Sequence, residues 1–241
     1  MESTLPMHDV PSKPPRPGRL RRPVLVATAV AGLVAAVLGG LLVAVTATTP
    51  AFYRARLDAG ATAGAEQAAR RLITKVVGLQ AAAKRAGPWE AAITENELNA
   101  WLALDLPRNH AGLLPTGVTA PRIELADHLV WLGVRVGVGP LSAVVSCGLE
   151  IRLREANQVE CTVADARVGA VPVPRGPLLH ALAARLEPLG IMAEIRRGDG
   201  RSVLVVTLPA GIGPAARRCT IEALAVAPGE LLMAGETKEG R

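Results

Sequence analysis

The fold class of this chain is decided by residues 141–153, which read LSAVVSCGLEIRL. Every odd-numbered position from Leu141 to Leu153 is apolar, whereas the even-numbered positions are mostly small, polar or charged. Successive side chains of a strand point to opposite faces, so this alternation predicts a long β-strand with one buried face.

The following stretch, residues 159–163, also has apolar residues at odd positions and is the predicted partner of that strand. Facing residues of an antiparallel pair share a face, so their numbers must add up to an even value. Sums of 312 or 314 place Cys147 opposite Asp165 or Arg167, which is roughly 13 to 20 Å along the strand from Cys161. A disulfide needs α-carbons within about 7 Å, so we expect Cys147 and Cys161 to be unbridged core residues. With Cys219 the cysteines number three, which does not indicate a disulfide framework.

Further strands and a helix are expected on both sides of this pair. Residues 123–125 and 129–136 should form strands around an Ala-Asp turn, and the second of them is apolar on both faces at its start. Turn residues also predict two later hairpins, 191–195 with 203–208 and 219–226 with 231–235. Between these regions, Pro177 is expected to begin a helix whose apolar side consists of Leu178, Leu179, Leu182 and Leu186.

Two helices are predicted before the sheet. The first is amphipathic and ends near Gly87-Pro88, with an apolar face of Ala65, Ala69, Leu72, Ile73, Val76, Leu79 and Ala83. The second begins at the sequence ITENEL, residues 93–98, and ends at about Leu104, with Leu98, Trp101 and Leu102 facing inward. Thr94 and Glu97 have the spacing of a capping box, so Glu95 and Glu97 are interpreted as a helix start and not as a catalytic acid/base pair.

An uncharged segment near the N-terminus predicts a membrane anchor. Residues 24–46 carry no charge, and their twelve Leu and Val residues favour insertion by about 4 to 7 kcal/mol. Five basic residues precede this segment, which places the N-terminus in the cytoplasm. A cleaved signal peptide is the alternative, although its apolar core is normally only about 7 to 15 residues long. The expected organisation is a disordered cytoplasmic tail (1–22), a transmembrane helix (23–48), an extracytoplasmic α+β domain (49–236) and a loose C-terminal tail (237–241).

Small residues recur at every fourth position of the anchor, at Gly32, Ala36 and Gly40. Such a face lets two helices approach closely in a membrane, so a homodimer through these residues is a hypothesis.

Charge and motifs exclude several function classes. The net charge of +6 comes in part from the basic residues before the anchor. The rest of the chain has no basic stripe interleaved with aromatic residues, so the sequence does not predict nucleic-acid binding. The four histidines stand alone without a metal-ligand spacing. No nucleophile elbow, phosphate-binding loop or dinucleotide fingerprint is present. We therefore predict a non-catalytic protein without metal or cofactor.

Several short motifs resemble those of small bacterial membrane-anchored proteins of the YpmS-like kind and, more remotely, tubular lipid-binding (TULIP-like) domains. They are the anchor, ITENELNAWL at residues 93–102, DARVG at 165–169 before PVP at 172–174, and PGEL at 228–231. The resemblance implies a single-pass protein of the bacterial inner membrane. It also implies a long curved antiparallel sheet wrapped on a helix, with a lengthwise apolar groove suited to acyl chains.

The resulting hypothesis is an α+β domain that binds a lipid or another amphiphile in an apolar groove. The residues expected to line the groove are Leu141, Val145, Leu149, Ile151, Val163, Leu179 and Leu182. The alternative for these residues is an ordinary packed core, because alternating apolar residues are core by default. The alternative for the protein is an envelope scaffold or accessory subunit that binds a partner protein, which an exposed apolar patch or open edge strand would indicate.

Overall fold

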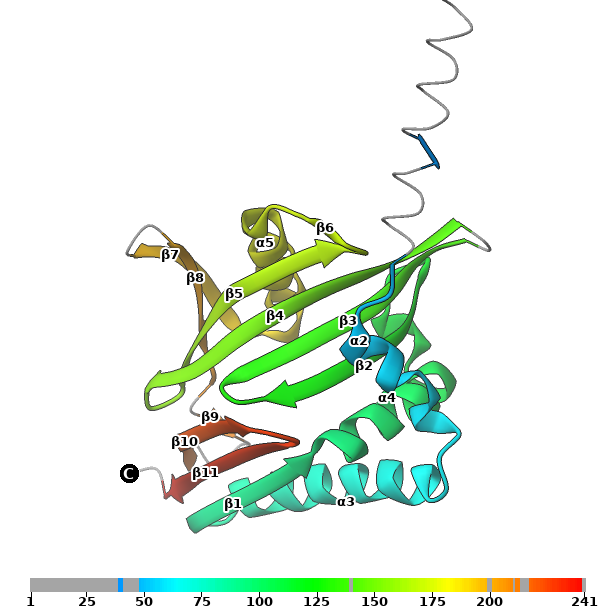
Figure 1. Ribbon diagram of the computed structural model, residues 1–241. Helices are drawn as coiled ribbons and strands as arrows, with labels where there is room; N and C mark the ends of the chain where they lie inside the picture. The colour runs from blue at the N-terminus through cyan, green and yellow to red at the C-terminus, as the bar shows by residue number, and fades with distance from the viewer. Residues whose placement is uncertain are drawn as a thin grey trace, which may run out of the picture. The chain divides into compact units, whose positions relative to one another are not determined.

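The long strand predicted at residues 141–153 is β4, which runs from Leu141 to Glu155. It lies in the middle of a seven-stranded antiparallel sheet with the order β2-β3-β4-β5-β8-β7, in which β6 pairs with β5 (Figure 1). The computed structural model describes residues 39–40, 48–138, 141–198, 201–209, 211–212 and 217–239. Residues 44–241 form one compact unit, and the unit 1–43 is described only at Gly39 and Gly40.

The strands of the described residues form two sheets, whereas the resemblance implied one long sheet. The second sheet has four strands in the order β1-β11-β10-β9. The strands of the seven-stranded sheet are β2 (Val118–Ala126), β3 (Leu129–Val138), β4, β5 (Gln158–Val168), β6 (Val171–Pro172), β7 (Met192–Gly198) and β8 (Arg201–Thr207). Those of the four-stranded sheet are β1 (Gly87–Thr94), β9 (Gly211–Ile212), β10 (Arg217–Ala227) and β11 (Glu230–Lys238). The helices are α2 (Ala51–Ala55), α3 (Ala65–Ala83), α4 (Glu95–Asn109) and α5 (Arg175–Leu186), with short 3-10 turns at Leu57–Gly60, Ala111–Leu113 and Glu187–Leu189.

The register of β4 and β5 agrees with the predicted parity along only part of the pair. Leu149 faces Val163, a sum of 312, but a bulge shifts the register so that Cys147 faces Ala166. The prediction of Asp165 or Arg167 opposite Cys147 was therefore wrong, because a bulge adds one residue to one strand and reverses its parity. The two cysteines are nevertheless free and buried, as predicted.

The main core lies between the seven-stranded sheet and α5. Leu149, Val163 and Leu179 are buried in it, and the predicted apolar side of α5, including Leu178, Leu182 and Leu186, packs there. In this core the side chains of the odd positions of β4 meet those of the helix, which confirms the predicted packing of the second amphipathic helix.

On the opposite face of the sheet, α2 covers part of β2 and β3. Trp131 of β3 lies against Gly148, and its ring packs against that of Phe52 with centroids 5.8 Å apart. Tyr53 is fully buried against Gly133. β3 is thus covered on both sides, which explains why both faces of its sequence begin apolar.

Polar side chains fix this N-terminal segment to β2. The Tyr53 hydroxyl donates to the Ala120 carbonyl at 2.7 Å. Arg122, which is only 7% exposed, donates to the carbonyl oxygens of Arg56 and Leu57 at 2.7 and 2.9 Å. The segment that follows the predicted anchor is therefore an integral part of the domain.

The start of α4 connects the two sheets. The predicted capping box is present between Thr94 and Glu97. The amide of Asn99 donates to the Ile123 carbonyl at 2.7 Å and accepts from the Ile123 N–H at 2.9 Å, so the side chain pairs with β2 as a strand would. Glu95 accepts from the Leu125 N–H at 2.8 Å, and its own N–H donates to Gly229 of the β10–β11 turn.

The helices differ from the prediction in which side they bury. Ile73 and Val76 of α3 were expected on the apolar face but are 41% and 38% exposed. α3 packs through Ala65, Ala68 and Ala69 on Ala100 of α4. The buried side of α3 is therefore narrower than the apolar face predicted from its sequence. Of the residues expected to face inward, Leu98 and Trp101 pack against core clusters and Leu102 is half-buried. α4 also extends to Asn109 and buries Glu97, Asn99, Ala100 and Leu106, of which none was predicted to be buried. It does so because it lies between α3 and β2 and uses polar residues to join them.

The ends of the domain also differ. β1 was not predicted, because the expected helices left only Gly87 to Ile93 between them. β11 continues to Lys238, and Thr237, expected in the loose tail, is 1% exposed. The predicted anchor and the face of Gly32, Ala36 and Gly40 lie outside the described residues, apart from Gly39, Gly40 and Thr48. Among the residues that are described, no helix is both long and apolar enough to cross a membrane.

Replacing Asn99 should test its role as a strand substitute. Asn99→Ala leaves the buried N–H and carbonyl of Ile123 without their partner, so we expect a loss of about 2 to 4 kcal/mol in the free energy of unfolding. Urea denaturation measures it, and Asn96→Ala, on the exposed side of the same helix turn, is the control. Equal midpoints for the two variants would contradict the assigned role.

The core cysteines should resist alkylation. Burial raises the pKa of Cys147 and Cys161 to about 11, with a further contribution from Cys161 at Cys147. At pH 8 only about one thiol in a thousand would then be ionised, so iodoacetamide should modify neither residue in the folded protein. The same shift predicts a loss of stability as pH rises from about 9 to 11, where unfolded thiols ionise and folded ones do not. Mass spectrometry of alkylated peptides, with and without urea, checks the first expectation.

Candidate functional site

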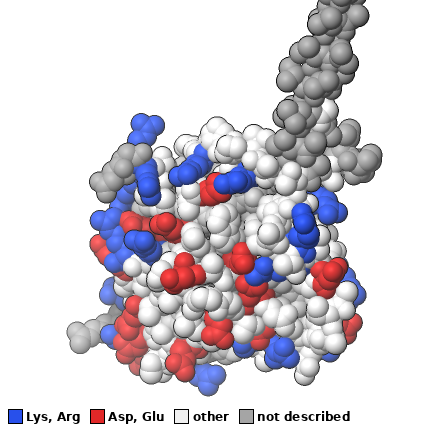
Figure 2. Space-filling model, viewed as in Figure 1, with Lys and Arg blue, Asp and Glu red and all other residues white. Residues whose placement is uncertain are grey.

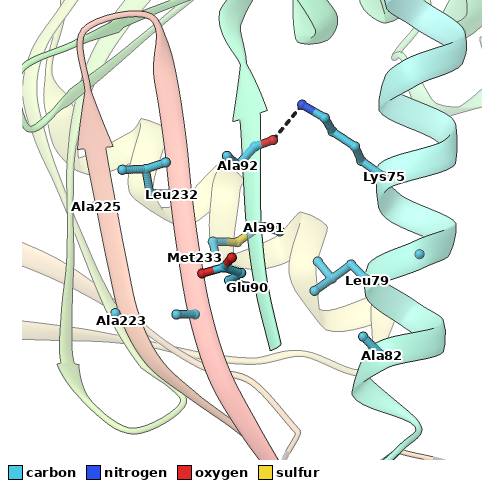
Figure 3. Close-up of a pocket in the computed structure, with 12 residues that line it drawn as sticks. Lys75, Leu79, Ala82, Glu90, Ala91, Ala92, Ala223, Ala225, Leu232 and Met233 are labelled. Carbon is cyan, nitrogen blue, oxygen red and sulfur yellow. Dashed lines mark hydrogen bonds between the residues drawn. The ribbon is translucent and has the colours of Figure 1, made fainter. Parts of the chain in front are cut away.

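An open cavity of about 830 Å³ lies between the C-terminal part of α4 and the start of β2. Two others lie beside α3, away from the residues that the sequence had indicated. One of them is a cleft of about 840 Å³ between α3 and the four-stranded sheet (Figure 3). Helix α3 runs along β1, and Leu79 and Ala82 point from it toward that strand (Figure 3). The lining residues are Lys75, Gly78, Leu79, Ala82, Glu90, Ala91, Ala92, Ala223, Ala225, Leu232, Met233 and Ala234.

Half of the residues that line the cleft are alanines. Two rows of paired residues lie on the same face of β1, β11 and β10. They are Ala92–Leu232–Ala225 and Glu90–Ala234–Ala223. Helix α3 packs on the opposite face of this sheet, where Leu79 and Ala82 contact the cluster around Trp89. The face of the two rows is exposed and carries mainly methyl groups, so the cleft beside α3 stays open and Leu232 remains 39% exposed.

A bulge in β10 turns these alanines toward the cleft. The pairing with β11 shifts between Ile221 and Ala223, so the parity of β10 reverses at that point. Ala223 and Ala225 then share the face of Ala234, whereas Val226 is directed into the main core and is 3% exposed. One strand thus supplies both a core face and a cleft wall.

The charged end of the cleft is formed by Lys75. Its ammonium donates to the Ala92 carbonyl and to Glu97, both at 2.8 Å, and the first of these bonds is drawn in Figure 3. Arg71 also lies 3.5 Å from the Glu97 carboxylate. Burial tends to raise the pKa of Glu97, but the hydrogen bonds from Lys75 and Thr94 outweigh it and hold the pKa below its usual range. Two cations therefore share one buried carboxylate, and Glu90 adds a further carboxylate to the lining.

A second cavity, of about 500 Å³, lies beside Trp89 near the C-terminal end of α3. Its lining residues are Leu79, Gln80, Ala83, Lys84, Trp89, Asn157, Leu208, Pro209, Cys219 and Ile221. The indole ring of Trp89 lies directly against Gly235, where a Cβ would overlap both the ring and the Thr220 carbonyl. We call this space the Trp89 cavity.

Five of the seven groove residues predicted from the sequence lie in or against the main core. Leu149, Val163 and Leu179 are buried in the main core, and Ile151 and Leu182 pack against it. Val145 is half-buried and pairs with Val134 and Val168, and the side chain of Leu141 lies outside the description. The structure brings Val163 and Leu179 together at a small cavity of about 200 Å³, which also borders Arg175 and Ser202.

The cleft residues were missed because each is inconspicuous in the sequence. Alanine has no strong strand preference and suggests neither a buried nor an exposed position. The usable signal was the repetition of alanine at positions 223, 225 and 227 of a predicted strand. Its meaning depends on α3, which contacts this sheet only after the chain has folded.

Neither the surface charge nor the side-chain clusters of the described residues indicate a catalytic centre. Acidic and basic side chains are interspersed over the face in Figure 2. No group of three or more metal-ligating side chains occurs within the described part of the chain. Comparison with protein-family models, with curated proteins and with solved structures found no match to this chain.

Two glycines that line or support these cavities should respond oppositely to alanine. Gly235→Ala forces Trp89 and β10 apart, and we expect it to destabilise the fold by about 2 kcal/mol or more. Gly78→Ala meets no atom within 4 Å in the middle of α3, so it should stabilise the fold by about 0.5 to 1 kcal/mol. Thermal or urea unfolding measures both, and a destabilising Gly78→Ala would contradict the open cleft.

Proposed function

We propose that this chain is a membrane-anchored extracytoplasmic protein of the bacterial inner membrane, without catalytic activity. Its domain binds the hydrocarbon chain of a lipid or another amphiphile in the cleft beside α3. The observation that carries the proposal is the alanine wall of that cleft, which leaves apolar surface exposed on the face of the sheet beside α3.

The size and chemistry of the cleft suit a hydrocarbon chain. Its volume of about 840 Å³ lies within the ~300 to 1,000 Å³ range of small-molecule sites, which are mostly apolar with a few polar groups. Burying one methylene group contributes about 0.8 kcal/mol. Eight to ten buried methylenes would give roughly 6 to 8 kcal/mol, which corresponds to micromolar affinity before the cost of association is subtracted.

The polar groups of the cleft favour an amphiphile over a pure hydrocarbon. Lys75 and Arg71 stand at one end and share a single carboxylate, that of Glu97. An anionic headgroup could lie near these two cations while its chain follows the alanines, because opposite charges attract across a partly exposed site. In this proposal the groove is beside α3 and not along β4, where the sequence had placed it.

Filling the cleft should abolish binding. Ala225→Trp places an indole among the alanines, and we expect at least a tenfold weaker affinity for cis-parinaric acid, measured by its fluorescence with the full chain in an amphipathic polymer. Ala181→Trp, at an exposed position of α5 outside the cleft, is the matched control. Equal affinities of the two variants would refute binding in the cleft. Native mass spectrometry of the unsubstituted protein should also detect a co-purified lipid.

A second candidate function is an envelope scaffold or accessory subunit that binds a partner protein. The observation that favours it is the exposed apolar surface of α3, where Ile73, Val76 and Val77 are 41%, 38% and 57% exposed. Such surface on a folded domain is typical of an interaction site. Crosslinking in intact cells would recover one stoichiometric protein partner in this case, and Val77→Lys would abolish the crosslink.

A further inference from the structure

One end of the seven-stranded sheet carries exposed basic side chains. At this end β3 meets β4, β5 meets β6, and β7 meets β8. Helix α5 also begins here, directly after β6. The exposed arginines of these segments and of α2, which we call the basic rim, are Arg54, Arg135, Arg167, Arg175, Arg197 and Arg201.

Most of the basic rim has no counter-charge. Five of its six arginines form no ion pair with another described residue. Arg167 is the exception and pairs with Asp165 at 2.6 Å. Toward the other end of the same sheet, Arg152 and Arg154 each pair with a glutamate. In Figure 2 the charged side chains along the upper margin of the domain are mainly basic, although both signs occur over the rest of the face. The basic rim therefore keeps a positive charge that an outside partner can neutralise.

Exposed apolar side chains accompany these arginines. Leu113, which is 60% exposed, lies in the connection before β2, and Val136 of β3 is 37% exposed beside Arg135. The Gly137 N–H donates to the Gly117 carbonyl at 3.1 Å, which joins this connection to the end of β3. A surface with both cations and exposed apolar groups suits the boundary between the headgroups and the acyl chains of a membrane.

The chain enters the domain at the same end. Only Ala47 separates Thr48 from the uncharged segment 24–46, and one extended residue spans at most about 3.6 Å. In Figure 1 the coil that begins at Thr48 descends to α2 from this end of the sheet. The Arg54 side chain donates to the Thr49 carbonyl at 3.2 Å, so the basic rim begins where the chain enters. If residues 24–46 span the membrane, the basic rim must lie close to its surface.

We propose that the basic rim is a docking surface for the anionic headgroups of the membrane in which the chain is anchored. This inference rests on the anchor of the proposed function, but not on ligand binding in the cleft beside α3. Each basic side chain close to an anionic surface strengthens association about fivefold. The anchor also keeps the domain at a high effective concentration near the lipids, so individually weak contacts suffice. Docking holds the domain in one orientation against the membrane.

Energy transfer to the membrane measures docking in the full chain. Ala170→Cys places a dye in the exposed β5–β6 turn at the basic rim, and Ala156→Cys places it in the exposed β4–β5 turn at the other end of β5. The native cysteines are buried and should not react. The acceptor is a rhodamine lipid in vesicles of phosphatidylcholine, with or without phosphatidylglycerol.

The dye at the basic rim should respond to the charge of the lipid. We expect phosphatidylglycerol to raise the transfer from position 170 at least about twofold, with little change from position 156. A salt concentration of about 1 M should reverse the rise, because the Debye length is then only ~3 Å. Equal transfer with and without phosphatidylglycerol, as expected if the basic rim served a partner protein or a second copy, would overturn the proposal.

A pair of charge reversals assigns the effect to the basic rim. Arg175→Glu with Arg201→Glu should lower the ratio of docked to undocked domains at least about tenfold in vesicles with phosphatidylglycerol. Arg70→Glu with Arg85→Glu makes the same change in net charge on and just after α3, and it is the matched control. Equal losses in the two double variants would refute the assignment to the basic rim.

Flotation with vesicles of phosphatidylcholine alone tests the anchor separately. A chain that floats but shows no transfer dependent on phosphatidylglycerol refutes the docking and leaves the anchor in place. A chain that does not float refutes the anchor, and the docking with it.

Discussion

The start of α4 is the interaction on which the domain depends. Glu95 and Asn99 bind the backbone of β2, and the N–H of Glu95 binds Gly229 in the turn of the other sheet. The Gly229 N–H in turn donates to the Leu125 carbonyl of β2 at 2.8 Å. Two motifs far apart in the sequence, ITENEL and PGEL, therefore meet at one place. A second link between the sheets is made by Asn157 of the β4–β5 turn, whose side chain binds the Cys219 carbonyl and the Ile221 N–H of β10. The α4 junction is the one that also joins β1 and α3 to β2.

Much of the fold could be predicted because its signals are local. The alternation of residues 141–153, the capping box at Thr94 and the leucines of residues 178–186 each lie within one element, and each predicted that element correctly. The register failed at Cys147 because a single bulge residue reverses parity, and no feature of the sequence marks it. β1 was missed because its strand character comes from pairing with β11, which is distant in the chain.

The candidate site could not be predicted for a related reason. Apolar periodicity identifies residues that are expected to be buried. Leu149, Val163 and Leu179 are buried in the main core. A cleft instead requires residues that fail to fill the space between elements, such as Ala223, Ala225 and Gly78. Whether a small residue leaves a cavity depends on which side chains surround it. For the cleft, the packing of α3 and the bulge in β10 determine those surroundings, and both are tertiary features.

The burial of Tyr53 has a consequence for proteolysis of the chain. The segment after the predicted anchor is held by Tyr53, Arg56 and Arg122, and it covers Trp131 on the outer face of the sheet. A protease that cut within residues 51–58 would strip this cover and expose an apolar surface. A stable proteolytic fragment therefore requires cleavage upstream of α2, so the fold itself sets where a protease can cut without exposing the sheet.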